Sequence, residues 1–213
     1  MCGGKVMAMD KKAMYKLTYG LFVLTSNLDG RDSGCIINTG IQVTSEPNRI
    51  SIAVNKANFT HDLVKESGRF NISVLSEAAN FDLFRHFGFQ SGRDVDKFAG
   101  FTDCKRSANG LYYITAGTNS YISASVEQAI DLGSHTLFIA SVDDMEVLSD
   151  IASASYAYYQ SSIKPKPEKI ATEGKAVWRC KVCGYVYEGE DLPADFVCPI
   201  CKHPASDFEK VVG

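Results

Sequence analysis

This 213-residue sequence lacks several features that define large classes of proteins. It has no apolar run of about 18 residues, the length that a membrane-spanning helix requires. Its first residues lack the apolar segment of a secretory signal. With a formal net charge of −3, it also has no excess of basic residues of the kind that binds nucleic acid. We therefore expect a cytoplasmic protein with neither a membrane nor a nucleic acid as its partner.

Two common nucleotide-binding motifs are missing as well. The sequence contains neither the Gly-x-Gly-x-x-Gly turn of a dinucleotide-binding fold nor the glycine-rich phosphate loop that ends in Gly-Lys-Ser or Gly-Lys-Thr. It has no internal repeat of about 20–50 residues, which excludes solenoids and propellers. Hydrophobic residues make up 45% and charged residues 22%, as in ordinary soluble proteins. The length allows one ordinary domain and one small one.

Short strands dominate the pattern up to about residue 160. Ile50, Ile52 and Val54 alternate with small or polar residues, which is typical of a half-buried strand. Further strands are expected at residues 21–26, 33–44 with a break at Gly40, 70–74, 111–115, 121–127 and 136–142, and short helices at 10–19, 58–67 and 80–87. Because strands do not alternate regularly with helices, we predict a mainly β fold, an antiparallel barrel with short helices at its openings.

Residues 161–176 have the composition of a linker. They contain two prolines and four lysines and few side chains that could pack in a core. We interpret residues 1–8 as an unstructured lead, 9–160 as the main domain, 161–176 as the linker and 177–213 as a small domain. An ordered crossing over the surface is the alternative for the linker.

Four cysteines near the C-terminus have the spacing of a metal site. Cys180 and Cys183 form one Cys-x-x-Cys pair, and Cys198 and Cys201 form a second pair after 14 intervening residues. Two such turns can place four thiolates around one tetrahedral ion, either Zn²⁺ or a single iron. Two disulfides or four buried thiols are the alternative. The three remaining cysteines are an odd number without a pairing pattern, as expected in a reducing cytoplasm.

A candidate phosphate site lies where the strand that ends at Val54-Asn55-Lys56 meets the next helix. A helix N-terminus beside the amide of Asn58, the hydroxyl of Thr60 and a lysine suits an anion. Ser91-Gly92-Arg93 could add a second set of contacts. From the residues alone, a plain capped helix and a solvated turn are the alternatives.

His135 and Cys35 are isolated residues of the first domain that could take part in chemistry. His135 follows Gly133-Ser134 at the start of a predicted strand, and a lone histidine is more often structural or at the surface. Cys35 is flanked by apolar residues, where a thiol is usually a small buried hydrophobe. Neither residue identifies a reaction by itself.

The segment with the paired cysteines resembles rubredoxin. The likeness rests on Cys183-Gly184-Tyr185-Val186-Tyr187, on residues 195–201 and on Asp207-Phe208-Glu209, and it covers about the last 35 residues. Rubredoxins hold one iron and pass on single electrons, so the resemblance implies an Fe²⁺/Fe³⁺ centre bound by the four cysteines. Lys202 stands where the second turn usually has glycine, and this departure keeps a structural zinc as an alternative.

The first domain resembles the flavin reductase-like family of FMN-binding split β-barrels. The likeness rests on residues 15–26, 70–75 and 91–98, on the Ser45-Glu46-Pro47 turn and on Asn55-Lys56. The combination with the C-terminal segment is similar to the high-molecular-weight rubredoxins of anaerobic bacteria. In those proteins NAD(P)H reduces FMN, the flavin reduces the iron, and the iron reduces a flavodiiron protein that removes O₂ or NO.

Carried over position by position, the resemblance implies a set of FMN contacts. The phosphate would lie at the helix start, and the flavin ring along the strand that carries residues 35–39. The implied FMN-binding residues are Cys35, Ile36, Ile37, Asn38, Thr39, Asn55, Lys56, Asn58, Thr60, Ser91 and Arg93. His135 and Cys35 are the implied catalytic residues, with His135 near the nicotinamide. Ser134 replaces an aspartate of the family, so the histidine lacks a carboxylate that could orient it.

The resemblance therefore predicts an NAD(P)H-dependent flavin and rubredoxin oxidoreductase. FMN would take a hydride and pass single electrons to the iron, and a flavodiiron protein or another redox partner would receive them. The family also implies a homodimer. The change at Ser134 favours one alternative, an electron carrier reduced by a separate enzyme. Lys202 supports the other, an FMN-binding protein with a structural zinc ribbon.

Overall fold

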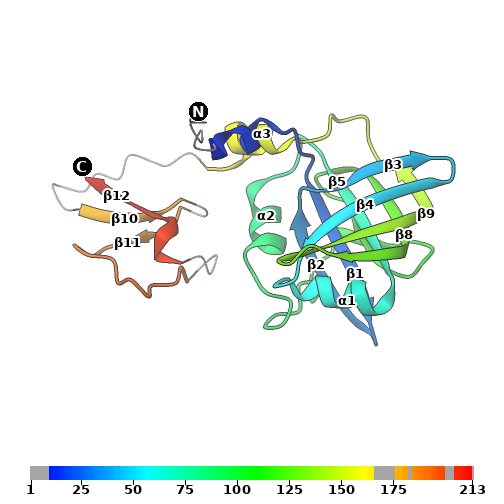
Figure 1. The fold of residues 1–213 in the computed structure, drawn as a ribbon, viewed down its shortest axis with the longest axis horizontal. Coiled ribbons are helices and arrows are strands. Elements are labelled where there is room, and N and C mark those ends of the chain that lie inside the picture. Colours follow the sequence, from blue (N-terminus) through cyan, green and yellow to red (C-terminus); the bar gives the residue numbers. More distant parts are fainter. Residues whose placement is uncertain (1–9, 166–175, 182–183, 200–203, 213) are drawn as a thin grey trace, which may run out of the picture.

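The computed structural model describes residues 10–165, 176–181, 184–199 and 204–212, which form a large and a small folded part (Figure 1). The large part is built on a seven-stranded antiparallel sheet with the strand order β2-β1-β5-β8-β9-β4-β3. Its strands are β1 (Phe22–Leu28), β2 (Arg31–Ile37), β3 (Ile41–Ser45), β4 (Asn48–Asn55), β5 (Arg69–Leu75), β8 (Thr118–Asp131) and β9 (His135–Val147). The prediction of a mainly β, antiparallel fold is confirmed.

Short helices and one additional hairpin complete the large part. They are η1, a 3-10 helix (Lys11–Lys16), α1 (Phe59–Ser67), α2 (Phe81–Gly88), α3 (Tyr156–Tyr158), the π-helix η2 (Tyr159–Ile163), and strands β6 (Cys104–Arg106) and β7 (Tyr112–Ile114). Gly68 ends α1 in the left-handed conformation with φ of 68°, as the sequence predicts. Among the described helices, none has the length and apolar composition needed to cross a bilayer.

The two-residue period of the strands divides the apolar residues between two cores. Phe22 and Leu24 of β1 belong to one core, which they share with Ile52, Phe70 and Phe138. Val23, which points to the opposite face of the sheet, belongs to a second core with the buried residues of α2. Alternation therefore places α2 against the outer face of the sheet, next to β1 and β2.

The structure corrects several predicted boundaries. The helix expected at residues 10–19 is the short 3-10 helix η1, and its apolar residues Met14 and Leu17 are 61% and 53% exposed. Gly88, the predicted stop, is the last residue of α2, and Phe89 is the C-cap. Strands β8 and β9 extend well beyond the predicted segments, and β9 includes Asp143. The hairpin strand β6 was not predicted.

The small part contains strands β10 (Ala176–Cys180), β11 (Val186–Tyr187) and β12 (Phe208–Val212), with the order β11-β10-β12, and the 3-10 helix η3 (Ala205–Asp207). Its buried core consists of Cys180, Cys198 and Phe208. Around these pack partly buried residues of the small part, most of them aromatic: Trp178, Tyr185, Tyr187, Leu192 and Phe196. Phe89, which follows α2 in the large part, packs against the same core. Two of the four cysteines with the predicted metal-site spacing therefore lie in one core with aromatic rings around them.

Candidate functional site

The predicted flavin strand is at an edge of the sheet. β2 contains Cys35, Ile36 and Ile37, and it pairs only with β1 within the described sheet. An edge strand has one row of backbone N–H and C=O groups that no neighbouring strand occupies. Cys35 is 6% exposed, and its Sγ accepts a hydrogen bond from Asn58 Nδ2 at 3.8 Å. β2 therefore combines a backbone edge with a buried thiol that faces the start of α1.

The residues after β2 connect it to the opposite side of the barrel. Asn38 and Thr39 are partly exposed. The Thr39 hydroxyl donates to the Ala53 carbonyl at 2.7 Å and accepts from the Ala53 N–H at 3.1 Å. This side chain ties the end of β2 to β4, so a cofactor contact from Thr39 would have to come from its backbone.

The start of α1 lies directly against β2. Thr60 is 1% exposed, and its Oγ1 lies 3.0 Å from the Oγ of buried Ser33 on β2. Asn58 stands at the N-cap position, but its side chain makes no capping hydrogen bond. The Asn55 side chain accepts from the Ala57 N–H at 2.9 Å and shapes the turn into the helix. The first N–H groups of a helix have no intrahelical acceptor, so this end can bind an anion.

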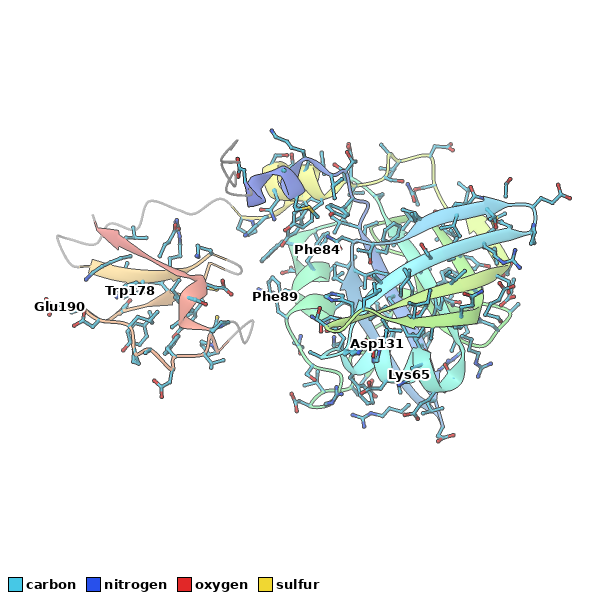
Figure 2. The ribbon with its side chains drawn as sticks, in the orientation of Figure 1. Lys65, Phe84, Phe89, Asp131, Trp178 and Glu190 are labelled. Carbon is cyan, nitrogen blue, oxygen red and sulfur yellow. The ribbon has the colours of Figure 1, made fainter. Side chains whose placement is uncertain are left out.

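Lys56, the lysine predicted for the phosphate, is paired with a carboxylate in the structure. Its Nζ donates to Asp131 Oδ1 at 2.6 Å, and the two side chains are 36% and 73% exposed. The hydrogen bond from Lys56, followed by one from the Gly133 N–H, holds the pKa of Asp131 below its usual value. Sequence analysis missed Asp131, which lies at the end of β8 (Figure 2).

Two arginines surround the first residue of α1. Arg93 donates to Asp62 Oδ2 at 2.6 Å, and its guanidinium carbon lies 5.3 Å from the centre of the Phe59 ring. Arg31, which sequence analysis missed, lies 4.3 Å from the same ring centre and donates to the Gly92 carbonyl at 2.8 Å. Both arginines line a cavity of about 480 Å³. The predicted Arg93 is therefore brought to α1.

Ser91 has a local role in the same loop. Its Oγ accepts the Arg93 N–H at 3.1 Å, while its carbonyl accepts two further N–H groups of the turn. These bonds shape the loop that carries Arg93.

Lys97 is a buried cation beside the flavin strand that sequence analysis did not single out. It is 3% exposed, and its Nζ donates to the carbonyls of Gly34 at 2.8 Å and Phe87 at 2.9 Å. Burial lowers the pKa of Lys97 to about 8. Burial also raises the pKa of Cys35 to about 11, although the nearby Lys97 charge opposes this shift. Cys35 is therefore a thiol at neutral pH.

His135 lies beside the start of α1 because β4 and β9 pair there. Asn55 is its register partner, and the Ser134 carbonyl accepts the Lys56 N–H at 3.0 Å. His135 Nδ1 lies 2.9 Å from Ser134 Oγ, so the residue that replaces the family's aspartate contacts the ring. Among the described histidines, His61 has a carboxylate partner: it is 4% exposed, and its Nδ1 lies 2.9 Å from Asp62 Oδ1. Sequence analysis did not identify His61.

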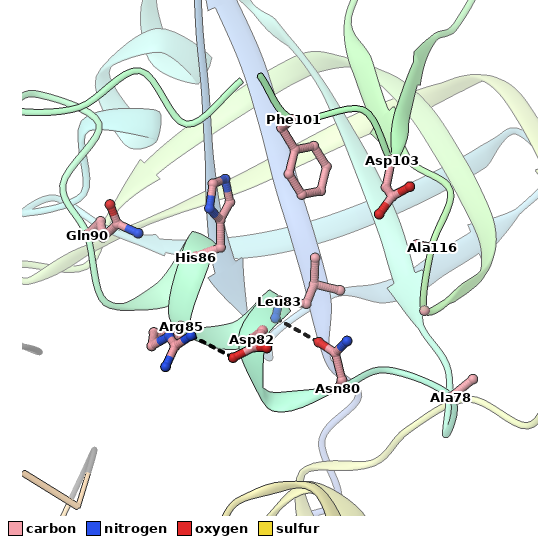
Figure 3. Close-up of a pocket in the computed structure, with 11 residues that line it drawn as sticks. Ala78, Asn80, Asp82, Leu83, Arg85, His86, Gln90, Phe101, Asp103 and Ala116 are labelled. Atoms are coloured by element: carbon pink, nitrogen blue, oxygen red, sulfur yellow. Dashed lines mark hydrogen bonds and ion pairs between the residues drawn. The ribbon is translucent and has the colours of Figure 1, made fainter. Parts of the chain in front are cut away.

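A second cavity, of about 500 Å³, lies beside α2 (Figure 3). None of the predicted site residues lines it. Three of its polar side chains have structural partners: Asn80 accepts the Leu83 N–H at 3.1 Å, and Arg85 pairs with Asp82 at 2.7 Å. His86 stacks on Phe101 with 5.0 Å between ring centres. The size of this cavity is therefore not a guide to the flavin site.

Two of the four predicted metal ligands are described, and both are buried. Cys180 is 1% and Cys198 is 0% exposed, and they share one core. The Gly184 N–H donates to the Cys180 carbonyl at 2.9 Å, and Gly184 has φ of 80°, which closes the first cysteine turn. Cys183 and Cys201 lie outside the described residues. Within the described ranges, no three metal-binding side chains form a group. Sulfur donors of this kind suit either iron or zinc.

Comparisons with known proteins agree with this two-part arrangement. The family model "Flavin reductase like domain" matches residues 14–166, and "Rubrerythrin, rubredoxin-like domain" matches residues 178–209. The chain is 36% identical to a high molecular weight rubredoxin from Moorella thermoacetica, over 95% of this chain and 100% of that protein. It is 40% identical to a ferric-chelate reductase (NAD(P)H) from Archaeoglobus fulgidus, over 77% and 96%.

A solved structure shows the same fold in the first domain. The NADH:FAD oxidoreductase from Streptomyces globisporus superimposes with a TM-score of 0.60 at 21% identity, over 71% of this chain and 93% of that one. Members of the flavin reductase family bind a flavin and use NAD(P)H, and rubredoxin-like domains bind iron through cysteines. The chain belongs to the flavin reductase-like family and carries a rubredoxin-like domain after its barrel.

Proposed function

We propose that the protein is an NAD(P)H-dependent oxidoreductase that passes electrons from FMN to one iron held by Cys180, Cys183, Cys198 and Cys201. The observation that carries this proposal is the union of both redox modules in one chain. When bound, the flavin supplies the chemistry that takes a hydride from the nucleotide and releases single electrons. The protein needs only to hold, orient and shield these groups.

The FMN phosphate is assigned to the start of α1. The Asn58 amide is not used for capping, and Arg31 and Arg93 place two positive charges around Phe59. An anion there would interact with the helix end and with these guanidinium groups. Lys56 would join when the phosphate replaces Asp131 as its partner, because both groups are exposed and such pairs are weak.

The flavin ring is assigned to the outer edge of β2. Backbone groups from Cys35 to Thr39 can hydrogen-bond the polar rim of the ring, as a neighbouring strand would. Lys97 holds β2 against the end of α2, because its Nζ donates to the carbonyls of Gly34 and Phe87. His135 and Cys35 remain the proposed residues nearest the reacting face, where the histidine would orient the nicotinamide.

The protein is proposed to act as a homodimer in the cytoplasm and to reduce a flavodiiron protein or another redox partner. β3 is the other edge strand of the sheet, and all five of its residues are exposed. They include Ile41 at 63% and Val43 at 44%, which a second copy could cover. Sedimentation of the holoprotein tests the dimer, and Ile41→Lys should yield monomers.

An electron carrier reduced by a separate enzyme is the second candidate function. It is favoured by His135, which contacts the hydroxyl of Ser134 and not a carboxylate. Without a carboxylate partner, the ring is less firmly oriented toward a nucleotide.

An anaerobic titration with NADH and then NADPH tests the proposal. We expect the flavin and iron absorption bands to bleach with at least one nucleotide. Bands that stay unchanged with both nucleotides, yet bleach with dithionite, would support the carrier. A flavin band without an iron band, together with bound zinc in a metal assay, would support the structural zinc ribbon.

A further inference from the structure

Phe89 joins the end of α2 to the core of the small domain. It is half-buried, and its backbone N–H donates to the Arg85 carbonyl at 3.2 Å, which fixes it at the end of the helix. Its ring packs against the cluster formed by Cys180, Cys198 and Phe208. Figure 2 shows Phe89 on the side of α2 that faces the small domain. An aromatic side chain of the barrel therefore covers the core that contains two predicted metal ligands.

The same end of α2 is fixed to the proposed flavin strand. A Cβ atom added at Gly88 would lie 3.3 Å from the Cγ1 of Ile36, and one added at Gly34 would lie 3.0 Å from the Phe87 ring. A larger residue at either position would therefore press on a side chain of the other element, so the two glycines let α2 and β2 pack closely. Lys97 also bridges the carbonyls of Gly34 and Phe87. Phe89 is thus one residue beyond the contact with Ile36.

A second contact joins the small domain to a segment that packs on α2. Lys164, just after η2, donates from Nζ to the Lys181 carbonyl at 2.7 Å, and Lys181 directly follows Cys180. The η2 segment is anchored on α2, because the rings of Tyr159 and Phe84 lie 4.4 Å apart between centres. Both contacts thus connect the neighbourhood of Cys180 to α2 or to a segment packed on it.

We propose that the C-terminal end of α2, with Phe89 at its centre, is the surface on which the rubredoxin-like domain of the same chain docks to receive electrons from the flavin strand. This inference rests on the proposed function. The hydride of one NAD(P)H carries two electrons and leaves NAD(P)⁺. Each electron reduces one Fe³⁺ to Fe²⁺, so two successive iron reductions consume one nucleotide and release one proton to solvent.

The decisive variant is Phe89→Asp, which puts a charge into the contact, with Phe89→Leu as the conservative rescue. Tyr156→Ala is the matched control, because it removes a 40% exposed aromatic residue that is not part of the small-domain cluster. Small-angle scattering of the holoprotein should show a larger radius of gyration for Phe89→Asp only. In anaerobic stopped flow, iron bleaching should slow at least about tenfold, the size expected when a central aromatic contact is lost. Flavin bleaching should be unchanged.

An unchanged radius of gyration or an unchanged rate of iron bleaching in Phe89→Asp would overturn the proposal. A flavin that neither nucleotide reduces contradicts the proposed function instead, and the scattering comparison then still decides whether the domains dock. Flavin content and thermal unfolding of the barrel show that the variant is folded.

Co-expression separates docking within one chain from docking on a second copy. One chain carries Phe89→Asp with intact cysteines, and the other carries Cys198→Ser with Phe89 intact. If docking occurs within the chain, iron bleaching stays slow in the mixed protein. Recovery of the fast phase would place the docking site on the neighbouring copy and refute the assignment to one chain.

Discussion

The two folded parts of this chain are stabilised in different ways. The barrel has two apolar cores that bury residues from β1, β4, β5, β9 and α2. The described core of the small part has three buried residues, of which two are the cysteines Cys180 and Cys198. A core of this size rarely stabilises a domain without a metal or disulfides. We conclude that the barrel folds by burying apolar surface and that the small domain depends on its bound ion.

Removing one metal ligand should therefore have the largest effect and should affect only one part. We expect Cys198→Ser to lose the bound metal and to unfold the small domain, because metal binding supplies most of its folding free energy. The flavin content of the barrel should stay within about twofold of the wild-type value, since no core residue of the barrel changes. The single tryptophan, Trp178, reports on the small domain by fluorescence. A native Trp178 spectrum without metal would contradict the comparison.

In the barrel, we expect a large loss of stability when a substitution removes a buried hydrogen bond between two elements. Thr60→Val leaves the Ser33 hydroxyl buried without the partner that lies 3.0 Å away. We expect a loss of about 1–3 kcal/mol in the free energy of unfolding, because an unsatisfied buried hydroxyl keeps its desolvation cost. Urea unfolding followed by circular dichroism measures it, and FMN affinity should fall as the start of α1 loosens.

The control for this change is Thr44→Val, which removes an exposed hydroxyl that donates to the Pro47 carbonyl at 2.6 Å. Its effect should stay within about 0.5 kcal/mol. Equal losses from the two substitutions would show that the contact between α1 and β2 is not special. The Trp178 spectrum should be unaltered in both variants.

Lys97 and Cys35 should give the stability of the barrel a pH dependence with two opposite contributions. Burial lowers the pKa of Lys97 from 10.5 to about 8, so between these values the unfolded chain binds a proton that the folded chain has released. Stability therefore rises with pH in this window. Burial raises the pKa of Cys35 from 9.0 to about 11, so the folded chain retains its proton and stability falls with pH from 9 to 11.

Variants separate these two opposite contributions. Relative to wild type, Lys97→Met should lose the increase in the free energy of unfolding with pH, which amounts to about 1 kcal/mol between pH 8 and 9. Cys35→Ser should lose the fall above pH 9, so its stability would keep rising toward pH 10.5. Urea midpoints of the barrel across this pH range measure both. If the urea midpoint of the wild type changed with pH in parallel with that of Lys97→Met, the rise in stability could not be assigned to Lys97.

The sequence reveals features that depend on near neighbours. Alternation in Ile50, Ile52 and Val54 predicted β4, and Gly68 correctly marked the end of α1. The four-cysteine metal site stays a prediction, and two of its members, Cys180 and Cys198, share one core. Periodicity and capping are local, so a single sequence carries them.

Contacts between distant segments could not be predicted in this way. Lys97 is buried although lysines are normally exposed, because its two acceptors, Gly34 and Phe87, come from β2 and α2. Asp131 neutralises Lys56 from 75 residues away. The ends of β8 and β9, residues 127–131 and 143–147, are mostly exposed and rich in polar residues, so no buried apolar face marks them in the sequence. The charges around the proposed phosphate site depend on such pairings.

The exposed pair of Lys56 and Asp131 should give the smallest change in stability. Asp131→Asn removes a pair in which both side chains face solvent, so the free energy of unfolding should change by no more than about 1 kcal/mol. FMN affinity should nevertheless increase, because Lys56 is then available to the phosphate. Lys56→Met should weaken FMN binding, mainly at low salt, where exposed charges are less screened.

Lys65→Met is the matched control, since Lys65 also acts on the Asp131 charge and makes no hydrogen bond to it. Titration of the apoprotein with FMN and with riboflavin distinguishes the phosphate from the ring. If the assignment is correct, Lys56→Met affects FMN and leaves riboflavin unchanged, and Lys65→Met affects neither strongly. If Lys56→Met weakened FMN and riboflavin binding equally, Lys56 would contact the flavin ring. The phosphate would then depend on Arg31 and Arg93 and not on Lys56.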